Sequence, residues 1–125
     1  MKTDLCRLLM IADEKLVVEE LLEYFDANGC ETEIALNTKT AVNIINERQM
    51  DLVIIGLKDQ ESLDLVHDII TVINETNSTI PIVIFGGEKS KRTENKLIKA
   101  GATKCCPNPI EKEELLNVIN GFMKR

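Results

Sequence analysis

Short runs of consecutive apolar residues alternate along this chain with longer segments in which apolar residues recur every three or four positions. The short runs are typical of strands buried on both faces of a sheet, and the longer spacing is typical of amphipathic helices. The run at 51–56 (Asp-Leu-Val-Ile-Ile-Gly) lies between a charge and a glycine and predicts the central strand. We predict five strands in all, at 8–12, 31–36, 51–56, 80–85 and 103–106.

A helix is predicted after each strand. Asp13 is placed to cap the first helix and Asn28-Gly29 to end it, and Ser62 is placed to cap the third. The remaining helices are predicted at 38–48, 88–100 and 111–124. Five strand–helix repeats with short connections imply an α/β fold, a doubly wound parallel sheet with helices on both faces. The apolar face of the first helix consists of Val18, Leu21, Leu22 and Phe25.

The composition indicates one acidic domain covering residues 1–125. A chain of this length builds one core but not two. Lys and Arg number 15 and Asp and Glu 21, so the net charge is 15 − 21 = −6. This charge argues against broad nucleic-acid binding, which needs a basic surface. No apolar run can cross a bilayer and the first residues lack a signal peptide, so we expect a cytoplasmic protein with no membrane partner. In that compartment we expect free thiols at Cys6, Cys30, Cys105 and Cys106.

Four segments form a pattern that is specific only in combination. They are 8–14 (Leu-Leu-Met-Ile-Ala-Asp-Glu), 51–56, 80–85 (Ile-Pro-Ile-Val-Ile-Phe), and 100–102 followed by Pro107-Asn108-Pro109. In this order and spacing they resemble the receiver domain of two-component response regulators. The resemblance covers nearly the whole chain and implies the flavodoxin-like strand order 2-1-3-4-5. It also implies a cis peptide bond between Asn108 and Pro109.

The resemblance implies a particular set of site positions. A working receiver carries a phosphoryl group on an aspartate at the end of its third strand. It holds Mg²⁺ with two acids after the first strand, and it has a hydroxyl residue ending the fourth strand and a lysine before the proline. The aspartate accepts the phosphoryl group and the acids hold Mg²⁺, while the ion, the hydroxyl and the ammonium stabilise the charge of the transferred group. In this chain these positions hold, in chain order, Ala12 and Asp13, Gly56, Gly86 and Asn108, and the aromatic switch position on the fifth strand holds Cys105.

We therefore hypothesise a pseudo-receiver that keeps the fold, is not an enzyme, needs no cofactor and acts through phosphorylation-independent contact with other proteins. Asp13 and Glu14 are the remaining candidates for a metal site, and we expect Mg²⁺ to bind them weakly. Their alternative role is to cap the first helix and favour its positive end.

Two other functions stay open. The first is a phosphorelay receiver that uses Asp13, Glu14 or Asp59 as a non-standard acceptor. The loop after Gly56, which contains Asp59, is also shorter than that of the family. The second is a sensor of a small ligand or nucleotide at the carboxyl ends of the strands, where glycines leave room. No glycine-rich fingerprint follows the first strand, which makes the sensor the weaker alternative.

The predicted helix at 88–100 is the candidate interaction surface. It is basic on an acidic chain, and few of its residues are apolar, which favours weak anchoring to the core. A solvated helix would show the same charges, but in receivers this helix, the fifth strand and the last helix form the output and dimer face. We expect an acidic protein partner here, or a homodimer through the same three elements. The residues that we assign to the surface are Lys89, Lys91, Arg92, Lys96, Lys99 and Cys105.

Two further features are interpreted as structural. His67 has no Cys or His neighbour at metal-ligand spacing, so we expect a surface or edge residue. Cys105 and Cys106 are adjacent in a strand and point to opposite faces, so they are poorly placed to share a ligand. We expect one buried and one half-buried thiol.

Overall fold

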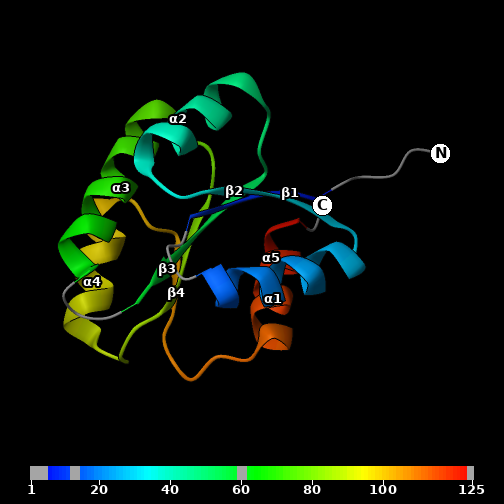
Figure 1. Ribbon diagram of the computed structural model, residues 1–125. Coiled ribbons are helices and arrows are strands. Elements are labelled where there is room, and N and C mark those ends of the chain that lie inside the picture. The colour runs from blue at the N-terminus through cyan, green and yellow to red at the C-terminus, as the bar shows by residue number, and fades with distance from the viewer. Residues whose placement is uncertain (1–5, 12–14, 59–61, 124–125) are drawn as a thin grey trace.

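The structure, a computed structural model, describes residues 6–11, 15–58 and 62–123, with the side chains of residues 15–18 outside the described set. Helices and strands alternate throughout (Figure 1). Their bounds are β1 Cys6–Ile11, α1 Lys15–Ala27, β2 Cys30–Ala35, α2 Thr38–Glu47, β3 Leu52–Leu57, α3 Leu63–Thr76, β4 Ile82–Gly86, α4 Lys91–Ala100, β5 Lys104–Cys106 and α5 Lys112–Met123.

The five strands form one parallel sheet in the order β2-β1-β3-β4-β5, which confirms the doubly wound, flavodoxin-like fold. Helices α1 and α5 cover one face of the sheet, and α2, α3 and α4 cover the other (Figure 1). Among the described residues, β2 and β5 are the edge strands. The carboxyl ends of all five strands therefore meet at one end of the sheet.

The central strand β3 is buried on both faces, as its apolar run predicts. Val53 and Ile55 enter the core beneath α2, α3 and α4, and Leu52 and Ile54 enter the core beneath α1 and α5. None of these four side chains is more than 1% exposed. Continuous apolar sequence is the consequence of two covered faces, since no position on such a strand meets water.

The described part of α1 agrees with its prediction. Leu21 and Phe25 are buried and Leu22 is half-buried, whereas the side chain of Val18 lies outside the described residues, as does Asp13, the expected cap. The last helix, α5, buries Leu115, Leu116 and Ile119 against the same face of the sheet.

Several element ends differ from the predicted ones, and one predicted cap is correct in position only. Strand β2 ends at Ala35, because its pairing with β1 ends at Ile11↔Ala35, and Leu36 is 68% exposed. Helix α4 begins at Lys91 and not at 88, because Ser90 is its N-cap and accepts a hydrogen bond from the Thr93 N–H at 3.2 Å. Ser62 does occupy the N-cap position of α3, but its side chain makes no capping hydrogen bond.

Candidate functional site

The carboxyl ends of β3 and β4 bring together two of the predicted site positions. Gly56 lies opposite Phe85, and the pairing continues to Leu57 opposite Gly86. Strand β3 thus extends one residue beyond Gly56, where the sequence predicted its end. Leu57 is only 5% exposed, so an apolar side chain directly follows the position where receivers carry the acceptor.

The backbone at Gly86 leaves no room for a side chain. Its φ is +95°, and an added Cβ would lie 2.6 Å from the carbonyl oxygen of Leu57. Gly87 follows with φ +77°, and a Cβ there would lie 2.6 Å from Cδ2 of Leu57. Both conformations favour glycine. A Thr or Ser at position 86 would therefore require the β3 or β4 backbone to move.

Asn108 joins the same end of the sheet. Its backbone N–H donates a hydrogen bond of 2.9 Å to the carbonyl oxygen of Gly87. The peptide bond between Asn108 and Pro109 is cis, as the resemblance implied. The side chain of Asn108 is exposed, and the contact of this residue with Gly87 is made by its backbone N–H.

The acidic candidates for a metal or phosphoryl site lie outside the described residues. Ala12, Asp13 and Glu14 lie outside the described residues, and so does Asp59. Among residues 6–11, 15–58 and 62–123, no group of three or more His, Cys, Asp or Glu side chains is placed to hold a metal ion. The structure therefore brings Gly56, Gly86 and Asn108 to the same end of the sheet.

A cavity of about 300 Å³ lies between this strand end and the start of α4. Leu57, Gly86, Leu97 and Cys105 are among its lining residues, so its floor is apolar. Its outer wall is made by the polar segment that leads into α4, from 88 to 91. The candidate site thus continues directly into the predicted interaction surface.

Helix α4 presents its cations to solvent. Lys89, Lys91, Arg92, Lys96 and Lys99 are all exposed, and we call these five residues the α4 surface.

Two buried side chains and an ion pair connect this helix to the rest of the molecule. It buries only Thr93 and Leu97, and Ile98 is 41% exposed beside the cations. An ion pair of 3.3 Å between Lys96 Nζ and Asp64 Oδ1 connects α4 to α3. The surface is therefore basic, with one apolar side chain exposed within it.

The cysteines are free thiols among the described residues, and the expected burial of the adjacent pair is confirmed. Cys106 is buried and Cys105 is half-buried. Burial, and next the nearby Glu94 carboxylate, raise the pKa of Cys105 to about 11. Burial also raises the pKa of Cys106. Cys105 is therefore protonated at neutral pH and is a poor nucleophile.

His67 is half-buried at the edge of α3. Its Nδ1 lies 3.9 Å from Oδ1 of the neighbouring Asp68. Within the described chain, His67 belongs to no cluster of side chains that could hold a metal ion. This agrees with a structural edge residue.

Comparison with known proteins decides the family. The model of the response regulator receiver domain matches residues 8–120. The chain belongs to this family. A receiver domain of a Francisella response regulator has the same fold, with a TM-score of 0.80, 22% identity, and coverage of 94% of this chain and 95% of that one. A putative response regulator from Chloroflexus aurantiacus gives a TM-score of 0.81 at 19% identity, covering 98% and 100% of the two chains.

Curated relatives of this receiver domain are longer. The chain is 25% identical over 119 residues to the response regulator MprA of Mycolicibacterium vanbaalenii, which covers 95% of this chain and 51% of MprA. It is 24% identical over 121 residues to the virulence transcriptional regulatory protein PhoP of Shigella flexneri, covering 95% and 52%. The chain thus spans about half the length of these relatives. No helix in the described parts of the chain is long and apolar enough to span a membrane.

Proposed function

We propose that this receiver domain is a pseudo-receiver, a non-catalytic module that acts by binding other proteins and carries no phosphoryl group. The proposal rests on the residues at the carboxyl ends of β3 and β4. Gly56 supplies no carboxylate at the acceptor position, and Gly86 has neither a hydroxyl nor space for one. Since a phosphorylated receiver needs a nucleophile and fixed donors for the phosphoryl oxygens, the loss of both favours a module without this chemistry.

The lysine position supports the same proposal. Asn108 cannot supply the ammonium that would balance a phosphoryl group, and its side chain is exposed. We infer that the domain needs no Mg²⁺, because a single remaining carboxylate from the acidic pair holds this ion weakly. Without a phosphoryl group there is no ligand to shift the domain between two conformations, so we expect one conformation under all signalling conditions.

The α4 surface is our candidate for the binding function. Its five cations are exposed on a chain whose net charge is −6, and Ile98 adds an exposed apolar contact. Charge of this kind guides the approach of a partner with opposite charge. The partner that fits this surface is therefore an acidic protein.

Incubation with a small-molecule phosphodonor and Mg²⁺, followed by intact mass measurement, tests the proposal. We expect the mass to stay that of the unmodified chain at every time point. A matched variant, Gly56→Asp, restores the carboxylate and reports whether the missing nucleophile is the main cause. A gain of one phosphoryl group by the natural chain, removed by mild alkali as an acyl phosphate is, contradicts the proposal, and mapping to Asp13, Glu14 or Asp59 would identify the acceptor.

A further inference from the structure

The charges of this chain are segregated along the sequence. Residues 16–38 contain six acidic residues and no Lys, Arg or His. Residues 89–104 contain six Lys and Arg residues and one acid, Glu94. The first segment forms most of α1 and all of β2, and the second forms α4 and the start of β5. Each segment therefore gives one part of the fold a strong charge of one sign.

The fold places these two segments on opposite sides of the molecule. Leu21 and Phe25 of α1 pack into one core cluster, and Leu97 of α4 packs into the other, across the sheet. Strands β2 and β5, which belong to the two segments, are the opposite edges of the sheet. Figure 1 shows α1 and α4 on different sides of the strands. The acidic helix α1 and the basic helix α4 thus lie on opposite faces of the sheet.

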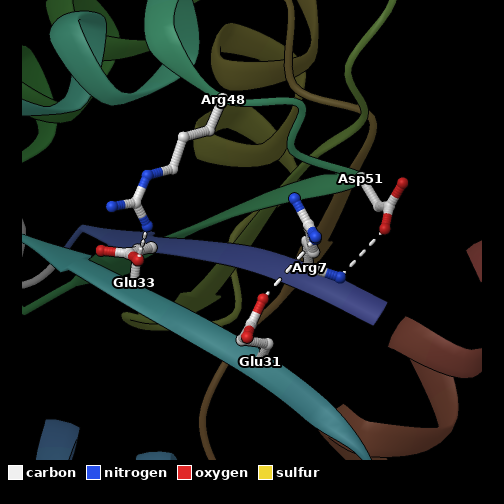
Figure 2. Close-up of polar contacts among 5 residues, drawn as sticks. All are labelled: Arg7, Glu31, Glu33, Arg48 and Asp51. Carbon is white, nitrogen blue, oxygen red and sulfur yellow. Dashed lines mark hydrogen bonds and ion pairs between the residues drawn. The ribbon is translucent and has the colours of Figure 1, made fainter. Parts of the chain in front are cut away.

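The acids of β2 are already paired within the chain. Figure 2 shows Glu31 beside Arg7 and Glu33 beside Arg48. The Glu31 Oε1 to Arg7 Nε distance is 3.5 Å. Figure 2 also shows Asp51 accepting a hydrogen bond from the backbone N–H of Arg7. These pairs neutralise the edge strand and leave its acids little charge to offer a partner.

The acidic side chains of α1, by contrast, can contact a partner. They are exposed, and no described residue forms an ion pair with them. Lys112 lies beside this helix, with its Nζ 5.0 Å from the centre of the Tyr24 ring. We call these four residues the α1 surface: Glu19, Glu20, Glu23 and Asp26.

Most cations of the α4 surface can likewise contact a partner. Lys96 is paired with Asp64, but Lys91, Arg92 and Lys99 have no acidic partner in the described chain. A two-fold contact centred on α4 would bring these cations against those of the second copy, which is destabilising. The chain itself carries the complementary surface, on α1.

We propose that the α4 surface of one copy binds the α1 surface of a second copy, head to tail. The proposal rests on the proposed function, in which α4 is the binding surface, and it names a second copy of this chain as the acidic partner. The contact is heterologous, so each complex keeps one α1 surface and one α4 surface open and further copies can add. Exposed ion pairs are individually weak, so the association is weak and sensitive to salt.

Sedimentation velocity over a concentration series tests this association. At roughly 10 mM salt, where the Debye length is about 30 Å, we expect the average mass to rise above the 14.0 kDa of one chain as concentration increases. At about 1 M salt, where the Debye length is about 3 Å, we expect a single species of one chain. A natural chain that remains a single copy at low salt overturns the proposal.

Two variants distinguish a head-to-tail contact from a symmetric dimer. The α4 variant carries Lys91→Gln, Arg92→Gln and Lys99→Gln, and the α1 variant carries the corresponding Glu→Gln changes at Glu19, Glu20 and Glu23. Each variant alone should remain a single copy. An equal mixture should form dimers and stop there, because each copy keeps one working surface. Neutral replacements are needed, since charge reversal would create a second complementary pair.

The controls separate this proposal from its alternatives. A variant with Lys39→Gln and Glu75→Gln, both exposed on other helices, should associate like the natural chain. If the α1 variant still forms dimers that do not grow, the contact is a two-fold dimer through α4 and the head-to-tail proposal is wrong. The phosphodonor experiment is independent of all these outcomes, so failure of the association leaves the proposed lack of phosphorylation unchanged.

Discussion

Replacing Gly86 by alanine tests the close approach of β3 and β4 on which the proposed function rests. Position 86 pairs with Leu57 at the last step of the β3–β4 ladder. The new Cβ would lie 2.6 Å from the Leu57 carbonyl oxygen, at a φ of +95°. The substitution therefore adds a backbone clash to an unfavourable backbone conformation.

The expected loss can be estimated by comparison with a second glycine. Gly29 has a similar φ of +87°, but an added Cβ meets no atom within 4 Å. Gly29→Ala should therefore cost only the conformational penalty, about 1–2 kcal/mol. Gly86→Ala should cost this amount plus the movement of a strand end, about 2–4 kcal/mol in total by analogy with other sites of backbone strain and overpacking. A loss of that size is a large part of the stability of a small domain.

Urea unfolding followed by circular dichroism measures the free energy of unfolding of both variants. Gly121→Ala provides a further control, because Gly121 lies within α5 with open space around it, and alanine should stabilise the helix by about 0.5–1 kcal/mol. The expected order of stability is Gly121→Ala, the natural chain, Gly29→Ala and then Gly86→Ala. If Gly86→Ala is no less stable than Gly29→Ala, the Leu57 carbonyl does not block position 86, and the argument that no hydroxyl residue fits there is refuted.

Three further predictions follow from capping and from the thiols. Ser90→Ala removes the N-cap bond to Thr93 and should destabilise α4 by about 1 kcal/mol, seen as faster amide exchange in α4, whereas Asn37→Ala should do the same only in α2. Burial, and next the hydrogen bond with Cys30, raise the pKa of Cys6 from its usual 9.0 to about 12, so the folded state keeps a proton that the unfolded chain loses. The stability from this thiol is complete below pH 9 and is lost as the pH rises through 12. Between pH 8 and pH 10 the natural chain should therefore lose roughly 1 kcal/mol more stability in urea unfolding than Cys6→Ala does, since Cys105 and Cys106 contribute equally to both. Alkylation of Cys105 by iodoacetamide should be slow at pH 7 and increase up to about pH 11, and a rate that levels off near pH 8 contradicts the raised pKa.

The sequence by itself determined the elements and their layers. The apolar run at 51–56 needed only its composition to predict a strand buried on both faces, and every described residue from Leu52 to Ile55 is buried. The spacing of Leu21 and Phe25 predicted the inner face of α1 in the same way. These properties are local, because they depend on which side chains follow one another along the chain. The strand order and the cis bond before Pro109 came from the family resemblance.

Local sequence predicted the ends of elements less well. Leu36 continued the alternation of β2 but is exposed, because the end of β2 depends on where β1 stops pairing with it. The polar pattern predicted that α4 begins at 88, but the helix begins at Lys91, because Ser90 is its N-cap and has an extended backbone. The first difference depends on pairing with a distant strand, whereas the second depends on a local cap, Ser90 to Thr93, that the sequence contains.

Only the tertiary structure showed how closely the backbone approaches at the site positions. The sequence shows that Gly56 and Gly86 have no side chains, but only the register of β3 with β4 brings the Leu57 carbonyl against position 86. In the same way, the sequence shows one acidic and one basic segment, but only the sheet order places them on opposite sides. The physical reason is that close approaches and surface charge patterns are contacts between distant segments, which exist only after the strands have paired.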